Sequence, residues 1–244
     1  MNKGVCFKVV VTVYNAEPWI GYCLYTILQQ SYKNYKLVVV NDASTDKTGK
    51  IIDSLQTRHG FQVIHRNKNE GPLKSRIDGI NLICEDDNDV IVTMDGDDWL
   101  YFPGVFEFLS KLYCNKNLWL TYGQFVFRSN LKRGISREVK NTRTYRKKGI
   151  WTTSQLRTFR YHLFKKINDA DLRMADGSYY KAATDLAHMY PMVEMAGPDR
   201  IKFIDDILYV YNDNHNLSTQ FRLPGMQSRN KKEIISKRPY KQLP

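Results

Sequence analysis

The 244-residue chain has no apolar run approaching 18 residues, so we expect no membrane-spanning helix. It has only four cysteines, and their spacing resembles neither a zinc motif nor a disulfide framework. We therefore expect Cys6, Cys23, Cys84 and Cys114 to be free thiols in a reducing compartment. The first residues enter an apolar run without the layout of a signal peptide. These absences together predict a cytoplasmic protein.

Positive charge is the main compositional bias. The formal net charge is +12, with a net of +10 in residues 131–173 and +6 in residues 222–244. Such basic zones attract a nucleoside diphosphate, an anionic acceptor, an anionic membrane or nucleic acid, or they keep a surface solvated. No nucleic-acid-binding motif accompanies them, so we expect no nucleic-acid partner. Peripheral contact with an anionic membrane stays an expectation.

The first half of the chain alternates strand and helix signals. Apolar, β-branched runs typical of buried parallel strands occupy residues 7–13, 36–40, 61–65 and 89–94. Apolar residues at helical spacing indicate helices at residues 17–30, 47–59 and 71–84. This alternation predicts a single α/β domain with a mainly parallel central sheet flanked by helices and right-handed crossovers.

Three carboxylates follow the fourth predicted strand, in the run Asp95-Gly96-Asp97-Asp98. Unpaired carboxylates are costly to bury, so these should meet a cation, hydrogen-bond donors or water. Hard oxygen ligands at short spacing suit Mg²⁺ or Mn²⁺, especially where phosphates complete the coordination shell. The alternative is an acidic turn that only closes the strand.

Polar loops also leave the first two predicted strands, at Tyr14–Glu17 and at Asn41-Asp42. Ligands of open α/β sheets bind outside the carboxyl ends of the strands. The three loops should meet at that edge, which predicts a nucleotide site.

Five ordered motifs resemble those of family 2 glycosyltransferases with the GT-A fold. They are Val11-Thr12-Val13-Tyr14-Asn15, Gln30-Ser31-Tyr32, residues 39–46, Asn69-Glu70-Gly71 with Arg76, and Asp95-Gly96-Asp97-Asp98. The likeness is close over residues 7–110 and looser to residue 221. It implies a donor-binding half at 1–110, an acceptor-binding half of the same domain at 111–221, and a basic C-terminal tail at 222–244.

The resemblance implies a set of residues that bind a nucleoside diphosphate sugar. The loop after the first strand and Asp42 would hold the base, Arg76 would neutralise the aspartates or approach the nucleotide, and Asp95 would face the ribose. The implied donor-binding residues are Val13, Tyr14, Asn15, Glu17, Asp42, Arg76, Asp95 and Gly96. Asp97 would bind the divalent cation, Mn²⁺ or Mg²⁺, that bridges both phosphates, with Asp98 in support.

The same resemblance places a catalytic base and a further metal ligand in the second half. The family's Glu-Asp pair reads Thr184-Asp185 here. Asp185 would take the acceptor's proton while its oxygen attacks the anomeric carbon in line with the leaving phosphate. A helix cap or first-turn charge is the alternative for Asp185. His215 would contact the metal or diphosphate, or be merely solvated.

The region Trp151–Tyr161 corresponds to an acceptor-facing segment in the family. Trp151 would stack on a sugar ring. Arg157 and Arg160 would share a helical face and grip an anionic acceptor or the diphosphate, and a basic helix packed by its apolar residues is the alternative. Gly177 would form a tight turn beneath the acceptor.

We therefore expect an inverting, metal-dependent glycosyltransferase that moves a sugar from a nucleoside diphosphate, by default UDP, to a hydroxyl of a glycan, lipid or protein. A sugar nucleotidyltransferase is one rival, although it would need a Gly-rich basic phosphate loop that residues 14–18 do not offer. A noncatalytic module that binds acidic polymer or nucleic acid is the other.

Overall fold

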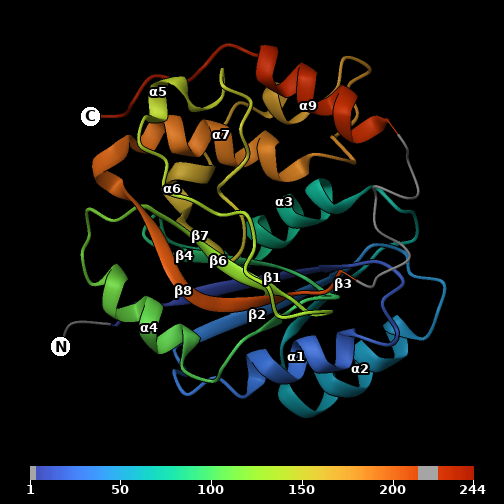
Figure 1. Ribbon diagram of the computed structural model, residues 1–244. Helices are drawn as coiled ribbons and strands as arrows, with labels where there is room; N and C mark the ends of the chain where they lie inside the picture. The colour runs from blue at the N-terminus through green and yellow to red at the C-terminus, as the bar shows by residue number, and fades with distance from the viewer. Residues whose placement is uncertain (1–3, 214–224) are drawn as a thin grey trace.

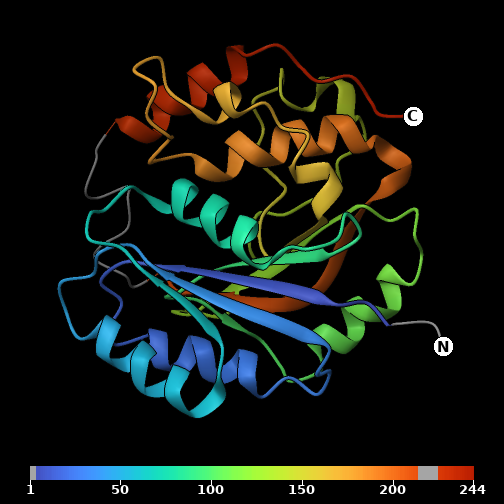
Figure 2. The same ribbon diagram turned by 180° about the vertical axis from the view of Figure 1, so that it is seen from behind.

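The computed structural model describes residues 4–213 and 225–244, and within them an eight-stranded sheet is covered by helices on both faces (Figures 1 and 2). His215 lies outside the described residues. No helix in the described part of the chain is long and apolar enough to cross a membrane.

The first half forms the predicted alternation. Its strands are β1 (Phe7–Val13), β2 (Tyr35–Asn41), β3 (Gln62–His65) and β4 (Val90–Asp95). Its helices are α1 (Ile20–Leu28), α2 (Thr48–His59) and α3 (Pro72–Ile83). β1 pairs in parallel with β2 and β4, and β2 pairs in parallel with β3. The carboxyl ends of all four strands therefore lie at one sheet edge.

The second half extends this sheet with strands of both directions. Its strands are β5 (Trp99–Leu100), β6 (Leu120–Phe127), β7 (Arg157–Arg160) and β8 (Ile201–Tyr211). Its helices are α4 (Val105–Tyr113), α5 (Thr142–Tyr145), α6 (Tyr161–Phe164), α7 (Thr184–Ala196) and α9 (Met226–Ser236), with 3₁₀ turns at Asp169–Leu172 and Pro198–Arg200. The strand order is β3-β2-β1-β4-β7-β6-β8-β5, and β7 is antiparallel to both of its neighbours. The predicted α/β class with a mainly parallel sheet is confirmed.

Alternate residues of the central strands supply two apolar cores. Val10 of β1 and Ile91 of β4 pack under α3 and α7, whereas Val9 and Val92 face α1 and α4. Figure 1 shows α1 and α2 on one side of the sheet and α3, α7 and α9 on the other. All of α7 except Asp185 is buried, because α3, α5, α6, α9 and β6 all pack against it.

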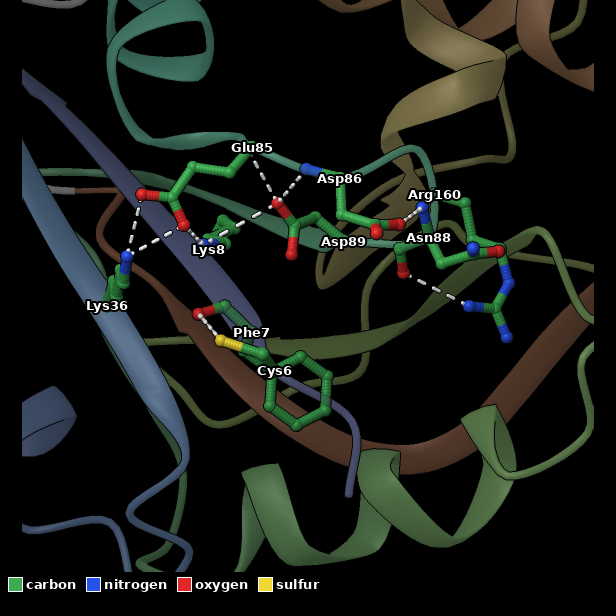
Figure 3. Close-up of polar contacts among 9 residues, drawn as sticks. All are labelled: Cys6, Phe7, Lys8, Lys36, Glu85, Asp86, Asn88, Asp89 and Arg160. Carbon is green, nitrogen blue, oxygen red and sulfur yellow. Dashed lines mark hydrogen bonds and ion pairs between the residues drawn. The ribbon is translucent and has the colours of Figure 1, made fainter. Parts of the chain in front are cut away.

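The expectation that Arg157 and Arg160 share a helical face is wrong, because both belong to β7. Side chains three apart in a strand point to opposite faces. β7 also runs antiparallel to β4, so Arg160 lies beside Val90 at the start of β4 and Arg157 beside Thr93 near its end. Arg160 donates hydrogen bonds to the carbonyls of Asn88 (Figure 3) and Leu118, at the sheet edge opposite the predicted site.

That opposite edge also holds a buried lysine. The Lys8 ammonium lies 3.4 Å from the Glu85 carboxylate and 3.5 Å from that of Asp89, and Glu85 also binds Lys36 (Figure 3). Asp89 accepts hydrogen bonds from the backbone amides of Glu85 and Asp86. A buried ammonium needs such partners, and here they join the starts of β1, β2 and β4.

Candidate active site at the carboxyl edge of the sheet

A cavity of about 580 Å³ opens at the carboxyl edge of β1, β2 and β4. α3 and the start of α7 form its walls, and Gln227 and Lys231 of α9 contribute to its lining. The predicted site residues that line it are Val13, Tyr14, Asp42, Arg76, Asp95, Gly96, Asp97, Asp98, Trp151, Thr184 and Asp185. Asn15, Glu17, Arg160 and Gly177 are not part of its lining, and Arg157 lines a smaller cavity next to it.

Asp95 and Gly96 begin the acidic turn after β4. One carboxylate oxygen of Asp95 lies 3.2 Å from Arg76 Nη2, and the other accepts from Gln155 Nε2 at 3.1 Å. A Cβ on Gly96 would lie 2.6 Å from Val13 Cβ, so no larger residue fits without movement. The turn is therefore packed directly against the end of β1.

Asp98 fastens the acidic turn to β8. It is buried, and its carboxylate accepts from the Tyr209 hydroxyl and from the Asn212 amide, both at 2.8 Å. Burial, with the nearby Asp97 and Asp95, raises the pKa of Asp98 well above its usual value. These contacts give Asp98 a supporting position within the turn.

Asp97 lies half-buried in the middle of the acidic turn and lines the cavity. Burial beside Asp95 raises the pKa of Asp97 to about 7, which a bound cation would reverse. No group of three or more His, Cys, Asp or Glu side chains is arranged to hold a metal within residues 4–213 and 225–244. Mg²⁺ is nevertheless commonly held by one or two carboxylates with substrate phosphates, and the hard oxygens of Asp97 and Asp95 fit that arrangement.

Asp185 lies in the first turn of α7 and faces two arginines. Its carboxylate is 2.7 Å from Arg157 Nη1 and 3.5 Å from Arg76 Nη1. Burial raises the pKa of Asp185, but the charges of Arg157 and Arg76 outweigh it, and the net pKa lies below the usual value. Thr184 precedes it, and the Thr184 carbonyl accepts from His188 Nδ1 at 2.8 Å. Asp185 is thus held ionised at the cavity wall.

Arg76 joins the two acidic positions. It is 1% exposed, and its guanidinium contacts Asp95 on one side and Asp185 on the other. Arg76 extends from the second turn of α3, which begins at Pro72 after Gly71. The charges of Arg76 and Arg157 therefore balance those of the two carboxylates, Asp95 and Asp185.

Asp42 braces the loop that precedes α3. Its carboxylate accepts from the backbone amides of Glu70 and Gly71, at 3.0 and 2.8 Å. Burial raises the pKa of Asp42, although the hydrogen bond from the Gly71 amide opposes the rise. Asp42 is nevertheless part of the cavity lining.

Asn15 and Glu17 brace the loop after β1. The backbone N–H of Asn15 donates to Ser44 Oγ at 2.9 Å, and the Glu17 carboxylate accepts from the backbone N–H of Lys47 at 3.1 Å. These contacts join the loop after β1 to the start of α2, which accounts for their distance from the cavity. Gly177 does form the predicted tight turn, with φ of +82°, but on an exposed loop.

Four further residues belong to the site and were not predicted as site residues. Lys181, Gln155 and Tyr211 line the cavities, and Tyr209 binds Asp98. Tyr209 and Tyr211 are two residues apart in β8 and so share a face of the strand. This spacing is visible in the sequence and could have predicted that the two side chains lie together. Gln155 lies in an irregular segment before β7 and carries no such signal.

Solved structures share this fold. S. aureus TarS in complex with UDP-GlcNAc aligns with a TM-score of 0.69 at 18% identity, over 94% of this chain and 64% of that one. The mannosyltransferase PcManGT from Pyrobaculum calidifontis, in complex with GDP-Man and Mn²⁺, aligns with a TM-score of 0.64 at 16% identity, over 98% and 67%. The fold is therefore of the GT-A class.

Residues 8–169 match the family model of glycosyl transferase family 2, and the chain belongs to this family. It is 25% identical to the uncharacterized glycosyltransferase EpsJ of Bacillus subtilis, over 94% of this chain and 68% of EpsJ. It is 35% identical to the glycosyltransferase GlyA of Streptococcus pneumoniae over 92 residues, 38% of this chain and 13% of GlyA. The chain thus spans about two thirds of EpsJ and of residues 1–349 of TarS, and a small part of GlyA.

Proposed function

We propose that this protein transfers a sugar from a nucleoside diphosphate sugar to an acceptor hydroxyl, with inversion at the anomeric carbon and Asp185 as the base. One observation carries the proposal: the acidic turn Asp95–Asp98 and the ionised Asp185 line one cavity at the carboxyl edge of the sheet. Membership of glycosyl transferase family 2 supports the same chemistry.

The donor occupies the side of the cavity formed by β1, β2 and β4. Tyr14 and Asp42 receive the base, Asp95 the ribose, and the diphosphate lies against Asp97. UDP is the first candidate because TarS structures hold UDP and UDP-GlcNAc, while GDP is the second because PcManGT holds GDP-Man.

Asp185 acts on the acceptor. Its pKa, held low by Arg157 and Arg76, keeps it ionised and able to accept a proton at neutral pH. The acceptor oxygen forms a bond to the anomeric carbon, its proton passes to Asp185, and the bond from the anomeric carbon to the phosphate oxygen breaks. One in-line displacement of this kind inverts the anomeric centre.

Mn²⁺ or Mg²⁺ would be held by Asp97 and Asp95 together with the diphosphate. Such a cation, when bound, offsets the charge that develops on the leaving group. Asp97 lies on the side of the cavity where the diphosphate binds. Asp98 holds the acidic turn in place by accepting a hydrogen bond from Tyr209.

The basic segment 128–150 supports peripheral contact of a cytoplasmic enzyme with an anionic membrane. Leu131 and Ile150 are 67% and 56% exposed among exposed lysines and arginines of this segment. Exposed aliphatic side chains between cations are typical of surfaces that bind anionic lipid. Salt-sensitive cosedimentation with vesicles of anionic lipid, but not of phosphatidylcholine, tests this part of the proposal.

Thermal stabilisation by UDP, GDP, CDP, ADP and dTDP, each with and without Mn²⁺, tests the donor assignment. A ligand at 100 times its dissociation constant stabilises the folded state by about 2.7 kcal/mol. We expect one nucleotide to raise the melting temperature, and to do so more strongly with Mn²⁺. If no nucleotide stabilises the folded protein, the cavity is not a donor site. That result would favour a noncatalytic binding module over a transferase.

A further inference from the structure

A second cavity, of about 250 Å³, adjoins the first, and Asp185 lines both. The two cavities share Asp95, Trp151, Asp185 and Tyr211 in their linings. A group in the second cavity can therefore reach Asp185 while the donor lies in the first. Its volume is below the range of roughly 300–1,000 Å³ typical of drug-sized ligands, so it suits a single ring.

Aromatic side chains dominate the walls of this second cavity. Phe125 and Phe127 of β6 and Tyr211 of β8 contact one another edge to face, with ring centroids 5.2–5.9 Å apart. Trp151 forms part of the wall on the side shared with the donor cavity, and Ile135 is a further lining residue. Aromatic faces stack well on the C–H face of a ring that carries its polar groups at the edge.

Gln155 and Arg157, which line this cavity, each have a solvent-shielded polar atom without a hydrogen-bond partner in the described part of the chain. Gln155 is 4% exposed and donates its amide to Asp95, while its Oε1 has no hydrogen-bond partner among the residues described. Arg157 Nε is likewise buried without a partner there. Gln155 Oε1 and the Asp185 carboxylate need donors, and Arg157 Nε needs an acceptor. A hydroxyl supplies both, whereas a carboxylate or phosphate supplies only an acceptor.

The charges around the cavity also disfavour an anionic ligand. Asp95 and Asp185 both line it, and the arginine in its lining, Arg157, is 1% exposed and paired with Asp185 at 2.7 Å. Arg160, the other arginine considered for gripping an anion, lies at the opposite sheet edge. An anion here would meet two carboxylates and no uncompensated cation from the described lining.

We infer that the second cavity binds the acceptor as an uncharged sugar ring, stacked on Phe127 and Tyr211, with one hydroxyl directed at Asp185. This inference rests on the proposed transfer reaction and adds the acceptor class to it. Gln155 accepts a hydrogen bond from a second hydroxyl of the ring and so contributes to acceptor specificity.

Calorimetric titration with methyl glycosides tests the inference, with the nucleotide that best stabilises the protein present and absent. The neutral probes are the methyl glycosides of glucose and galactose, and methyl glucuronide and methyl galacturonide are their anionic counterparts. We expect at least one neutral probe to bind, and the uronide of the same ring to bind at least about tenfold more weakly. Equal or tighter binding of the uronide overturns the inference, as does the absence of binding by every neutral probe.

Two lysine substitutions separate the cavity from general surface charge. Ile135→Lys places a cation at the cavity and should reduce the discrimination against the uronide at least about threefold. Leu131→Lys adds the same charge on the same segment, outside the cavity lining, and should leave discrimination unchanged. Both positions are more than half exposed, so both variants should fold. Equal effects of the two substitutions on discrimination contradict the inference. Absence of stabilisation of the unsubstituted protein by any nucleotide contradicts the donor assignment instead.

Discussion

The Arg157 guanidinium lies 2.7 Å from the Asp185 carboxylate and joins β7 to the first turn of α7. Arg157 is almost fully buried, and the side chain of Asp185 keeps 33% exposure toward the cavities. This contact fixes the orientation of the Asp185 carboxylate and lowers its pKa.

Replacing Arg157 by Met should move the acidic limb of the kcat/KM profile for transfer to higher pH. Without its nearest cation the pKa of Asp185 rises, by about 1 unit or more. Arg157→Lys keeps the charge but loses the planar fork, so it should lower the rate with little movement of that limb. The pH profiles of the three proteins provide the measurement. An unmoved limb in Arg157→Met would exclude Asp185 as the titrating base.

Asp185→Asn should lower the transfer rate by about 10²–10⁴-fold, because the amide cannot take the acceptor's proton. Stabilisation by the donor nucleotide should persist, since Asp185 lies on the acceptor side of the donor cavity. Radiolabelled transfer and thermal shift measure the two effects separately. Joint loss of transfer and nucleotide binding would indicate that Asp185 has a structural role.

Asp97 should make the protein less stable as pH rises. Its pKa, about 7 in the folded state against 3.8 for the free side chain, means that the folded state binds the proton more tightly. The stabilising contribution is therefore complete below about pH 4 and disappears as pH rises through 7. At pH 8, Asp97→Asn should be more stable than the unsubstituted protein by roughly 1–3 kcal/mol, as measured by urea unfolding. Parallel stability profiles of the two proteins between pH 4 and 8 would refute the shift.

Mn²⁺ should stabilise the protein more at pH 8 than at pH 6, with the nucleotide present. The cation requires an ionised Asp97, and protons compete for that carboxylate below pH 7. Asp97→Asn should lose most of this pH-dependent stabilisation. Thermal shift with and without Mn²⁺ at both pH values measures it, and identical Mn²⁺ effects in the two proteins would remove Asp97 from the metal site.

Gly96→Ala should destabilise the fold by about 1–3 kcal/mol, because the new methyl group would overlap Val13 at the end of β1. Gly21→Ala, within α1, is the matched control. Its methyl group would lie 3.8 Å from Ile51 of α2, an ordinary contact, and alanine should stabilise α1 by about 0.5–1 kcal/mol. Urea unfolding distinguishes the two signs. Similar values for both substitutions would show that the acidic turn tolerates movement away from β1.

Arg146→Met should cost about 3–5 kcal/mol, because it leaves Glu194 buried without its cation. Arg146 donates two hydrogen bonds to Glu194, at 2.8 and 2.6 Å, and both side chains are buried. Arg143→Met, an exposed neighbour in α5, should change stability by less than about 0.5 kcal/mol. Urea unfolding tests both, and a small effect of Arg146→Met would mean that Glu194 is readily rehydrated or protonated.

Much of the first half could be predicted from the sequence because its signals are local. The β-branched runs of β1, β2 and β4 are long and mostly apolar, and the chain alternates them with helices at regular intervals. The acidic turn was predicted as a site from its carboxylates after a buried strand, and Asp185 through family resemblance, and both line one cavity.

The second half was harder to predict because its strands depend on their neighbours. β7 has only four residues, two of them arginines, and it is a strand because β4 and β6 flank it. Its antiparallel direction sends Arg157 toward Asp185 and Arg160 to the opposite edge. No local pattern of charge or hydrophobicity records that separation.

The sequence alone determined the α/β class, the parallel order of the first strands and the presence of carboxylates at their ends, since hydrophobic periodicity and residue type are local properties. Only the tertiary structure decided which of these groups meet. It placed Arg76 between Asp95 and Asp185, turned Asn15 and Glu17 toward the start of α2, and formed a second, aromatic cavity beside the base. Those contacts join residues from distant parts of the chain, and packing of helices against the sheet brings them together.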